Sequence, residues 1–77
     1  MNIEEIREAL HKQPFESFTL QLTGGTERHI PHRDFIAVAK RRVAVFDSVT
    51  DALSILDPLH IVSIDYPGKD EIGRAHV

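Results

Sequence analysis

The sequence predicts a mainly β (α+β) fold, in which one N-terminal helix precedes a five-stranded, strongly bent antiparallel sheet or small barrel. Three observations support this class. Residues 2–12 place apolar side chains at helical spacing, residues 18–22 alternate with the period of a strand, and the remainder consists of short apolar runs between turn residues. At 77 residues the chain is long enough for one domain, which we expect to span residues 1–70.

A helix is expected over residues 2–12. Ile6 and Leu10 fall on one apolar stripe, and Asn2 can cap the first turn by accepting a backbone hydrogen bond. Pro14 ends the helix, because the residue before a proline is driven out of the helical conformation. A helix this short with a single apolar stripe must pack on another element to be stable.

A β-hairpin is expected directly after the helix. Residues 18–22 alternate apolar and polar, as in a half-buried strand. The pair Gly24-Gly25 then supplies a tight turn, because two adjacent glycines accept the positive φ that hairpin turns need. The return strand, residues 27–32, is more polar, and Pro31 removes a hydrogen-bond donor, so this strand is expected at an edge or bent.

Further strands are expected over residues 35–39, 43–46, 52–56 and 61–66, with a tight turn at Asp57-Pro58. The middle strands carry apolar groups on both faces, where a half-exposed sheet would alternate more cleanly. Two explanations stay open: a tightly curved barrel, or a face or edge that meets another subunit. The predicted core is Ile6, Leu10, Phe15, Phe18, Leu20, Leu22, Ile30, Phe35, Val38, Val43, Val45, Leu53, Ile55, Ile61 and Ile64.

Composition excludes several classes of protein. The net charge of −3 argues against a general affinity for nucleic acid, which depends on Lys and Arg neutralising phosphates. The chain has no cysteine, so disulfides and cysteine-based zinc sites are not possible. It has no run of about 18 apolar residues for a membrane span, and its N-terminus lacks a basic leader followed by an apolar core. We therefore expect a cytoplasmic protein.

The last seven residues, 71–77, read EIGRAHV and resemble the in-frame translation of a common sequencing-library adapter. We expect a disordered tail that results from sequencing and has no evolved function. The alternative is an ordinary disordered terminus.

The order and length of the expected elements over residues 2–66 resemble the small-barrel architecture shared by Sm-like and SH3-like folds. The chain also resembles a group of small uncharacterised bacterial proteins whose core reads PFxxFxLxLxxGxxxxIPHxDFIAV. The residues that carry this resemblance are Pro14, Phe15, Phe18, Leu20, Leu22, Gly25, Ile30, Pro31, His32, Asp34, Phe35, Ile36, Ala37 and Val38. The resemblance implies a small β-barrel and is silent on biochemical role.

Four side chains have the chemistry of metal ligands, because imidazole and carboxylate bind zinc, iron or nickel: His29, His32, Asp34 and His60. Two residues three apart on an extended strand point to opposite faces, so only a bend at Pro31 can bring His29 and His32 together. The competing interpretation is structural: His32 and Asp34 fix the bend through local hydrogen bonds.

One basic cluster is a candidate contact for nucleic acid: Arg33, Lys40, Arg41 and Arg42. In an Sm-like protein such a cluster would bind RNA, which also requires stacking aromatic side chains. The competing interpretation is a solvated hairpin turn, because Phe35 and Phe46 beside it suit a core.

No serine, threonine or lysine is marked as a nucleophile by its context, so we expect no catalytic residue and no cofactor. The function expected is a non-enzymatic interaction module that binds protein, in particular copies of itself as a homo-oligomer. The alternatives are an Sm-like protein that binds single-stranded RNA, and a metal-binding protein that uses the histidine and aspartate cluster.

Overall fold

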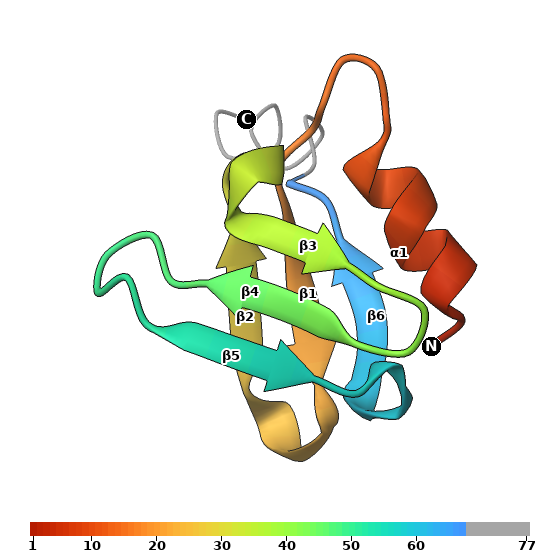
Figure 1. Cartoon of the computed structure of the whole chain (residues 1–77), viewed down its shortest axis with the longest axis vertical. Helices are drawn as coiled ribbons and strands as arrows, with labels where there is room; N and C mark the ends of the chain where they lie inside the picture. Colours follow the sequence, from red (N-terminus) through yellow and green to blue (C-terminus); the bar gives the residue numbers. More distant parts are fainter. Residues whose placement is uncertain (68–77) are drawn as a thin grey trace, which may run out of the picture.

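The computed structural model describes residues 1–67, and Figure 1 shows the arrangement of their elements. The helix is α1 (Ile3–Leu10), and the strands are β1 (Phe18–Leu22), β2 (Glu27–Ile30), β3 (Ile36–Val38), β4 (Val43–Phe46), β5 (Leu53–Leu56) and β6 (Ile61–Asp65). Three 3₁₀ turns join them: η1 (Thr23–Gly25), η2 (Arg33–Phe35) and η3 (Pro58–His60). The expected tail, 71–77, and the last residues of the expected domain, 68–70, lie outside the described residues.

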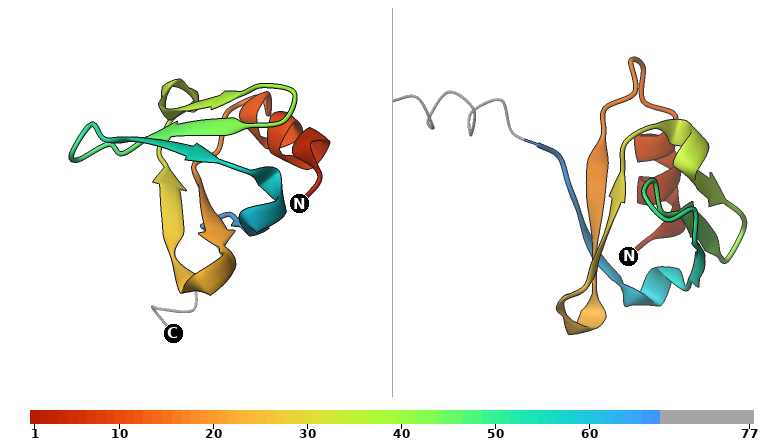
Figure 2. Two further views of the ribbon diagram at one scale, coloured as in Figure 1. Left: turned by 60° about the horizontal axis from the view of Figure 1, so that its bottom comes forward. Right: turned by 90° about the vertical axis from the view of Figure 1, so that its left-hand side faces the viewer.

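The mainly β fold with one leading helix is confirmed, but two details of the prediction are wrong. Residues 1–67 contain six strands, one for each of the six predicted ranges and one more than the predicted five-stranded sheet or barrel holds. These strands form two separate antiparallel sheets, ordered β2-β1-β6 and β3-β4-β5, instead of one sheet or a closed barrel. The turns η2 and η3 explain why two sheets form instead of a barrel, because each turn connects a strand of one sheet to a strand of the other. In Figure 2 the strands of one sheet cross those of the other, and α1 lies at one open end.

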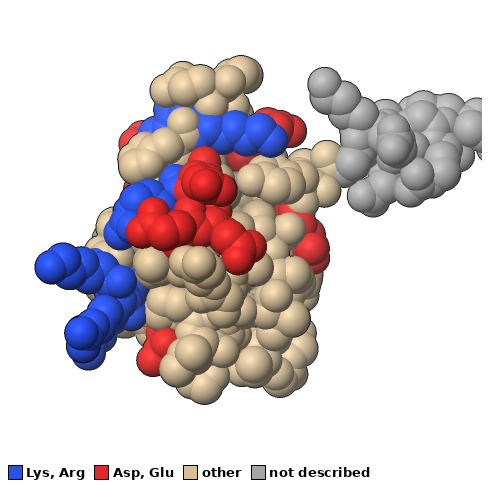
Figure 3. Space-filling view, turned by 90° about the vertical axis from the view of Figure 1, so that its right-hand side faces the viewer, with Lys and Arg blue, Asp and Glu red and all other residues tan. Residues whose placement is uncertain are grey.

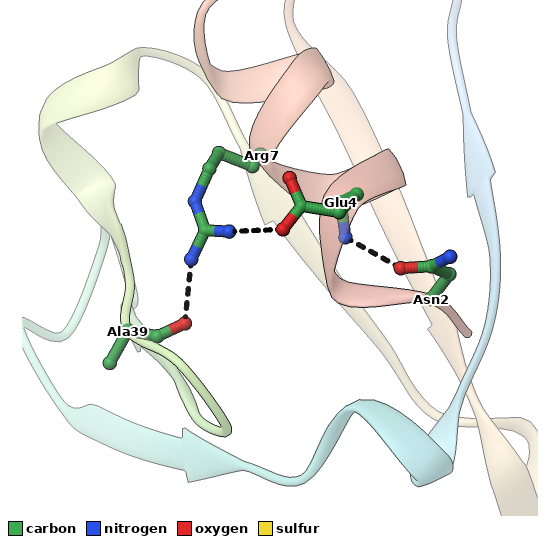
Figure 4. A network of polar contacts seen from close by, with 4 residues as sticks. All are labelled: Asn2, Glu4, Arg7 and Ala39. Atoms are coloured by element: carbon green, nitrogen blue, oxygen red, sulfur yellow. Dashed lines mark hydrogen bonds and ion pairs between the residues drawn. The ribbon is translucent and has the colours of Figure 1, made fainter.

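Helix α1 begins at the predicted cap. The side-chain oxygen of Asn2 accepts a hydrogen bond of 2.9 Å from the backbone N–H of Glu4, as drawn in Figure 4. The helix is shorter than the expected span, 2–12, because the chain leaves the helical conformation at His11. Ile6 is fully buried and packs into the core with the rest of the apolar stripe.

Within residues 1–67, no helix has the length and apolar content needed to cross a membrane.

The predicted turns have the expected chemistry. Gly24 and Gly25 both have φ +87°, a left-handed conformation that favours glycine, and they let β1 fold back onto β2. At the other turn, the side chain of Asp57 accepts a hydrogen bond of 2.9 Å from the N–H of Leu59, with Pro58 in the first turn position. Both turns could be predicted from the sequence, because each depends on the conformation and hydrogen bonds of a few neighbouring residues.

The core lies between the two sheets and α1. Its buried members are Ile6, Ala9, Phe18, Leu20, Leu22, Ile30, Ile36, Val43, Val45 and Ile61. Leu53 and Ile55 were wrongly predicted in this core, since both are more than half exposed. The prediction also chose Phe35 where the neighbouring Ile36 is buried. In β5 the side chains alternate with period two, and the structure places Ser54 and Leu56 inward, so Leu53 and Ile55 point outward.

Candidate protein-interaction surface

The outer side of the sheet β3-β4-β5 is apolar along its whole width. Strand register aligns Ala37 with Ala44 and Ala44 with Ile55, and it aligns Phe46 with Leu53 in the next row. We define the outer apolar face as Ala37, Ala44, Phe46, Leu53 and Ile55. Phe46 is 39% exposed, Leu53 54% and Ile55 58%. An antiparallel sheet with one face in water ordinarily carries polar residues on that face, so this side differs from a simple solvated surface.

The outer side of the other sheet provides the comparison within the same molecule. There the cross-strand neighbours are polar and bond to one another: the Thr19 hydroxyl lies 3.1 Å from His29 Nδ1, and Gln21 donates to Glu27 over 2.7 Å. Thus one sheet of this small domain has the polar exterior expected of a solvated face, and the other does not.

Strand β5 also leaves one edge of its backbone open. It lies at the end of its sheet, and β4 is its pairing partner. In an antiparallel ladder, hydrogen-bonded pairs alternate with pairs that are not hydrogen-bonded. The hydrogen bond of 2.8 Å from Asp47 N–H to Ala52 C=O makes Asp47 and Ala52 a hydrogen-bonded pair. Every second residue from Ala52, that is Ser54 and Leu56, therefore bonds to β4, and the backbone N–H and C=O of Leu53 and Ile55 point to the open edge.

Charges of opposite sign lie at the two ends of the β4-β5 pair. Lys40, Arg41 and Arg42 are exposed in the turn before β4, and within residues 1–67 their side chains form no ion pair or hydrogen bond. Figure 3 shows basic side chains projecting at one margin of the side of the molecule that it displays. A hollow of about 340 Å³ at this end is lined by Arg41, Arg42, Ile55, Leu56 and Asp57.

The loop at the opposite end, residues 47–52, is acidic. Asp47 organises it: one carboxylate oxygen accepts hydrogen bonds from the N–H groups of Thr50 and Val49, at 2.9 and 2.8 Å. These two bonds hold the pKa of Asp47 below its ordinary value, so the carboxylate stays ionised throughout the neutral range. Asp51, with φ +65°, adds a second carboxylate to the loop.

The predicted metal ligands are spread over the structure. His29 lies on β2 beside Thr19, whereas His60 lies in η3 with its Nδ1 3.3 Å from the Thr23 hydroxyl. The His32 ring lies 6.3 Å from that of Phe35, and Asp34 is exposed in η2. In the part of the chain that the structure describes, no three His, Cys, Asp or Glu side chains are grouped so that they could hold a metal ion.

Arg33 is separated from the other members of the predicted basic cluster by β3. Its guanidinium donates to the backbone oxygens of Leu10 and Lys12, at 3.2 and 2.9 Å, and it lies 5.2 Å from the centre of the Phe15 ring. The Leu10 carbonyl belongs to the last turn of α1, where backbone acceptors have no partner within the helix, and the Lys12 carbonyl lies just beyond it. Arg33 therefore ties the end of α1 to η2, a role that the sequence analysis missed.

Searches against family models, curated proteins and solved structures gave no match to this chain. The functional argument therefore depends on the residues and their geometry.

Proposed function

We propose that the protein is a non-enzymatic interaction module that associates with copies of itself through the outer apolar face. The observation that carries this proposal is the outward orientation of Leu53 and Ile55, which leaves two large aliphatic side chains in water on a face that also contains Phe46. Covering such a face removes apolar surface from water, which is the main favourable contribution to protein association.

The small size of the domain supports the same proposal. A chain of 77 residues buries a smaller share of its surface than a larger domain does, so its stability margin is narrow. Ten residues form the buried core of the described part, while further apolar area stays outside on the outer apolar face. Association would add this area to the buried total and stabilise the folded chain by an amount that grows with the logarithm of protein concentration.

Sedimentation velocity of the full chain, measured from low to high micromolar concentration, tests the proposal. We expect the weight-average sedimentation coefficient to rise with concentration from the value of one chain to that of a discrete oligomer. A single monomeric species across the whole range would contradict self-association.

RNA binding at the turn Lys40–Arg42 is a second candidate function, favoured by the absence of ion pairs at these three side chains within residues 1–67. If it occurs, titration of a labelled single-stranded oligonucleotide should show affinity that falls between about 50 mM and 200 mM salt, because bound phosphates release counterions. The double variant Arg41→Glu/Arg42→Glu should abolish this binding. Binding that is insensitive to salt or to the variant would contradict a phosphate contact at this turn.

A further inference from the structure

We propose that two copies of the chain join through their β5 edges, antiparallel and about a twofold axis, so that the basic turn 40–42 of each lies against the acidic loop 47–52 of the other. This inference rests on the proposed self-association, and it specifies the edge, the direction and the contacts. Three features of the described residues support it: an unprotected strand edge, an apolar face continuous with that edge, and opposite charges at its two ends.

Strand β5 is the least protected of the four edge strands in the described sheets. Natural proteins protect edge strands with charged side chains, prolines, bulges, short length or a covering element. Strand β2 carries Glu27 and Arg28, and β6 has a register shift and ends at Asp65. Strand β3 has three residues and packs beside α1.

Strand β5 has no charge and no proline among its four residues, LSIL, and its ladder to β4 is regular. Asp57 and Pro58 come only after its end. The backbone groups of Leu53 and Ile55 on the open edge can bond to an incoming strand, while their side chains extend the outer apolar face across the junction. Edge pairing therefore satisfies the backbone and brings the Leu53 and Ile55 side chains of the two copies into contact, which removes part of their apolar surface from water.

The charges select the antiparallel direction. Leu56, at the end of β5, lies beside Arg41 and Arg42 in the 340 Å³ hollow, and Leu53, at the start, follows the acidic loop. An antiparallel twofold arrangement brings the end of one β5 next to the start of the other, so each basic turn meets an acidic loop. A parallel arrangement would instead place like charges together, which costs stability.

The chemistry of the hollow fits a carboxylate from a second copy. Arginine recognises carboxylates through a planar fork of N–H donors, and both Arg41 and Arg42 line the hollow. Asp57 is the acidic group within this hollow, and its carboxylate already accepts the hydrogen bond from Leu59 N–H. The exposed Asp51 of the second copy is the carboxylate that we expect to reach the two arginines.

Charge exchange tests the contact between turn and loop. One variant, Arg41→Glu/Arg42→Glu, makes the turn acidic; another, Ser48→Lys/Val49→Lys/Asp51→Asn, makes the loop basic and leaves the capping side chain of Asp47 in place. All five positions are exposed, so both variants should fold. We expect each alone to associate about tenfold or more weakly than the wild type, because like charges meet. An equal mixture should regain wild-type affinity, because both contacts of the mixed dimer then join opposite charges.

A second pair of variants tests the strand edge. Ile55→Pro removes the N–H at the open edge, and Ile55→Val keeps it; we expect the first to abolish association and the second to retain it. Association should be measured by sedimentation velocity, with far-ultraviolet circular dichroism to show that each variant is folded.

The results separate the two proposals. If the wild type associates but the mixture does not restore binding, or if folded Ile55→Pro associates as the wild type does, the twofold edge arrangement is wrong while self-association stands. If the wild type stays monomeric, self-association itself is wrong.

Discussion

Replacing Phe18 with alanine is expected to destabilise the fold by about 3–5 kcal/mol, the range found when a buried aromatic side chain is truncated. Phe18 has no exposed surface and lies at the start of β1, the central strand of its sheet. Its ring centre lies 5.8 Å from that of Phe15 and 6.0 Å from that of Tyr66. Truncation therefore removes core packing and both ring contacts, and a small domain has little stability in reserve.

Urea denaturation followed by circular dichroism measures this loss, at a low protein concentration where association contributes little. Val49→Ala is the matched control, because Val49 is 90% exposed and its replacement should change stability by less than about 0.5 kcal/mol. A loss below about 1 kcal/mol for Phe18→Ala would show that this ring is not packed as described.

The double replacement Leu53→Ser/Ile55→Ser is expected to weaken self-association by about 30-fold while leaving the monomer folded. Each side chain is more than half exposed, and edge pairing covers part of that surface, so its burial contributes roughly 0.5 kcal/mol. A dimer contains four of these side chains, two from each copy, so the losses together approach about 2 kcal/mol, which corresponds to that change in dissociation constant. Inside the monomer the same change removes little buried surface.

A double replacement of two other exposed aliphatic residues, Leu59→Ser/Val62→Ser, is the matched control. Leu59 is 80% exposed in η3 and Val62 is 60% exposed on β6, both outside the outer apolar face. This variant should associate as the wild type does. Equal weakening by both variants would indicate non-specific hydrophobic association, and no weakening by Leu53→Ser/Ile55→Ser would remove the outer apolar face from the interface.

Features with a local cause were predictable from the sequence. The cap at Asn2, the glycine turn and the turn at Asp57 each depend on a few neighbouring residues, and all three formed as expected. The exposed basic turn, 40–42, was also recognisable, because it is a polar interruption between two apolar runs.

Features that depend on distant parts of the chain were not predictable. In β5, alternation shows that Leu53 and Ile55 share a face, but it does not show which face meets the core. We assigned the larger aliphatic pair to the core, whereas the structure buries Leu56 in part and turns that pair outward. The position of Arg33 depends on contacts with carbonyls more than twenty residues away in sequence, so no local pattern indicates it.

The packing of α1 beside β3 affects how far an assembly can grow. Arg7 donates to the carbonyl of Ala39, directly after this strand, over 3.0 Å (Figure 4). With β3 short and flanked by a helix, the described β3-β4-β5 sheet offers a full-length edge on one side only. Once a second chain pairs with the β5 edge, this sheet has no other full-length edge with which a third chain could pair. If the chains pair through β5 as proposed, we therefore expect a closed dimer that does not propagate into a fibril.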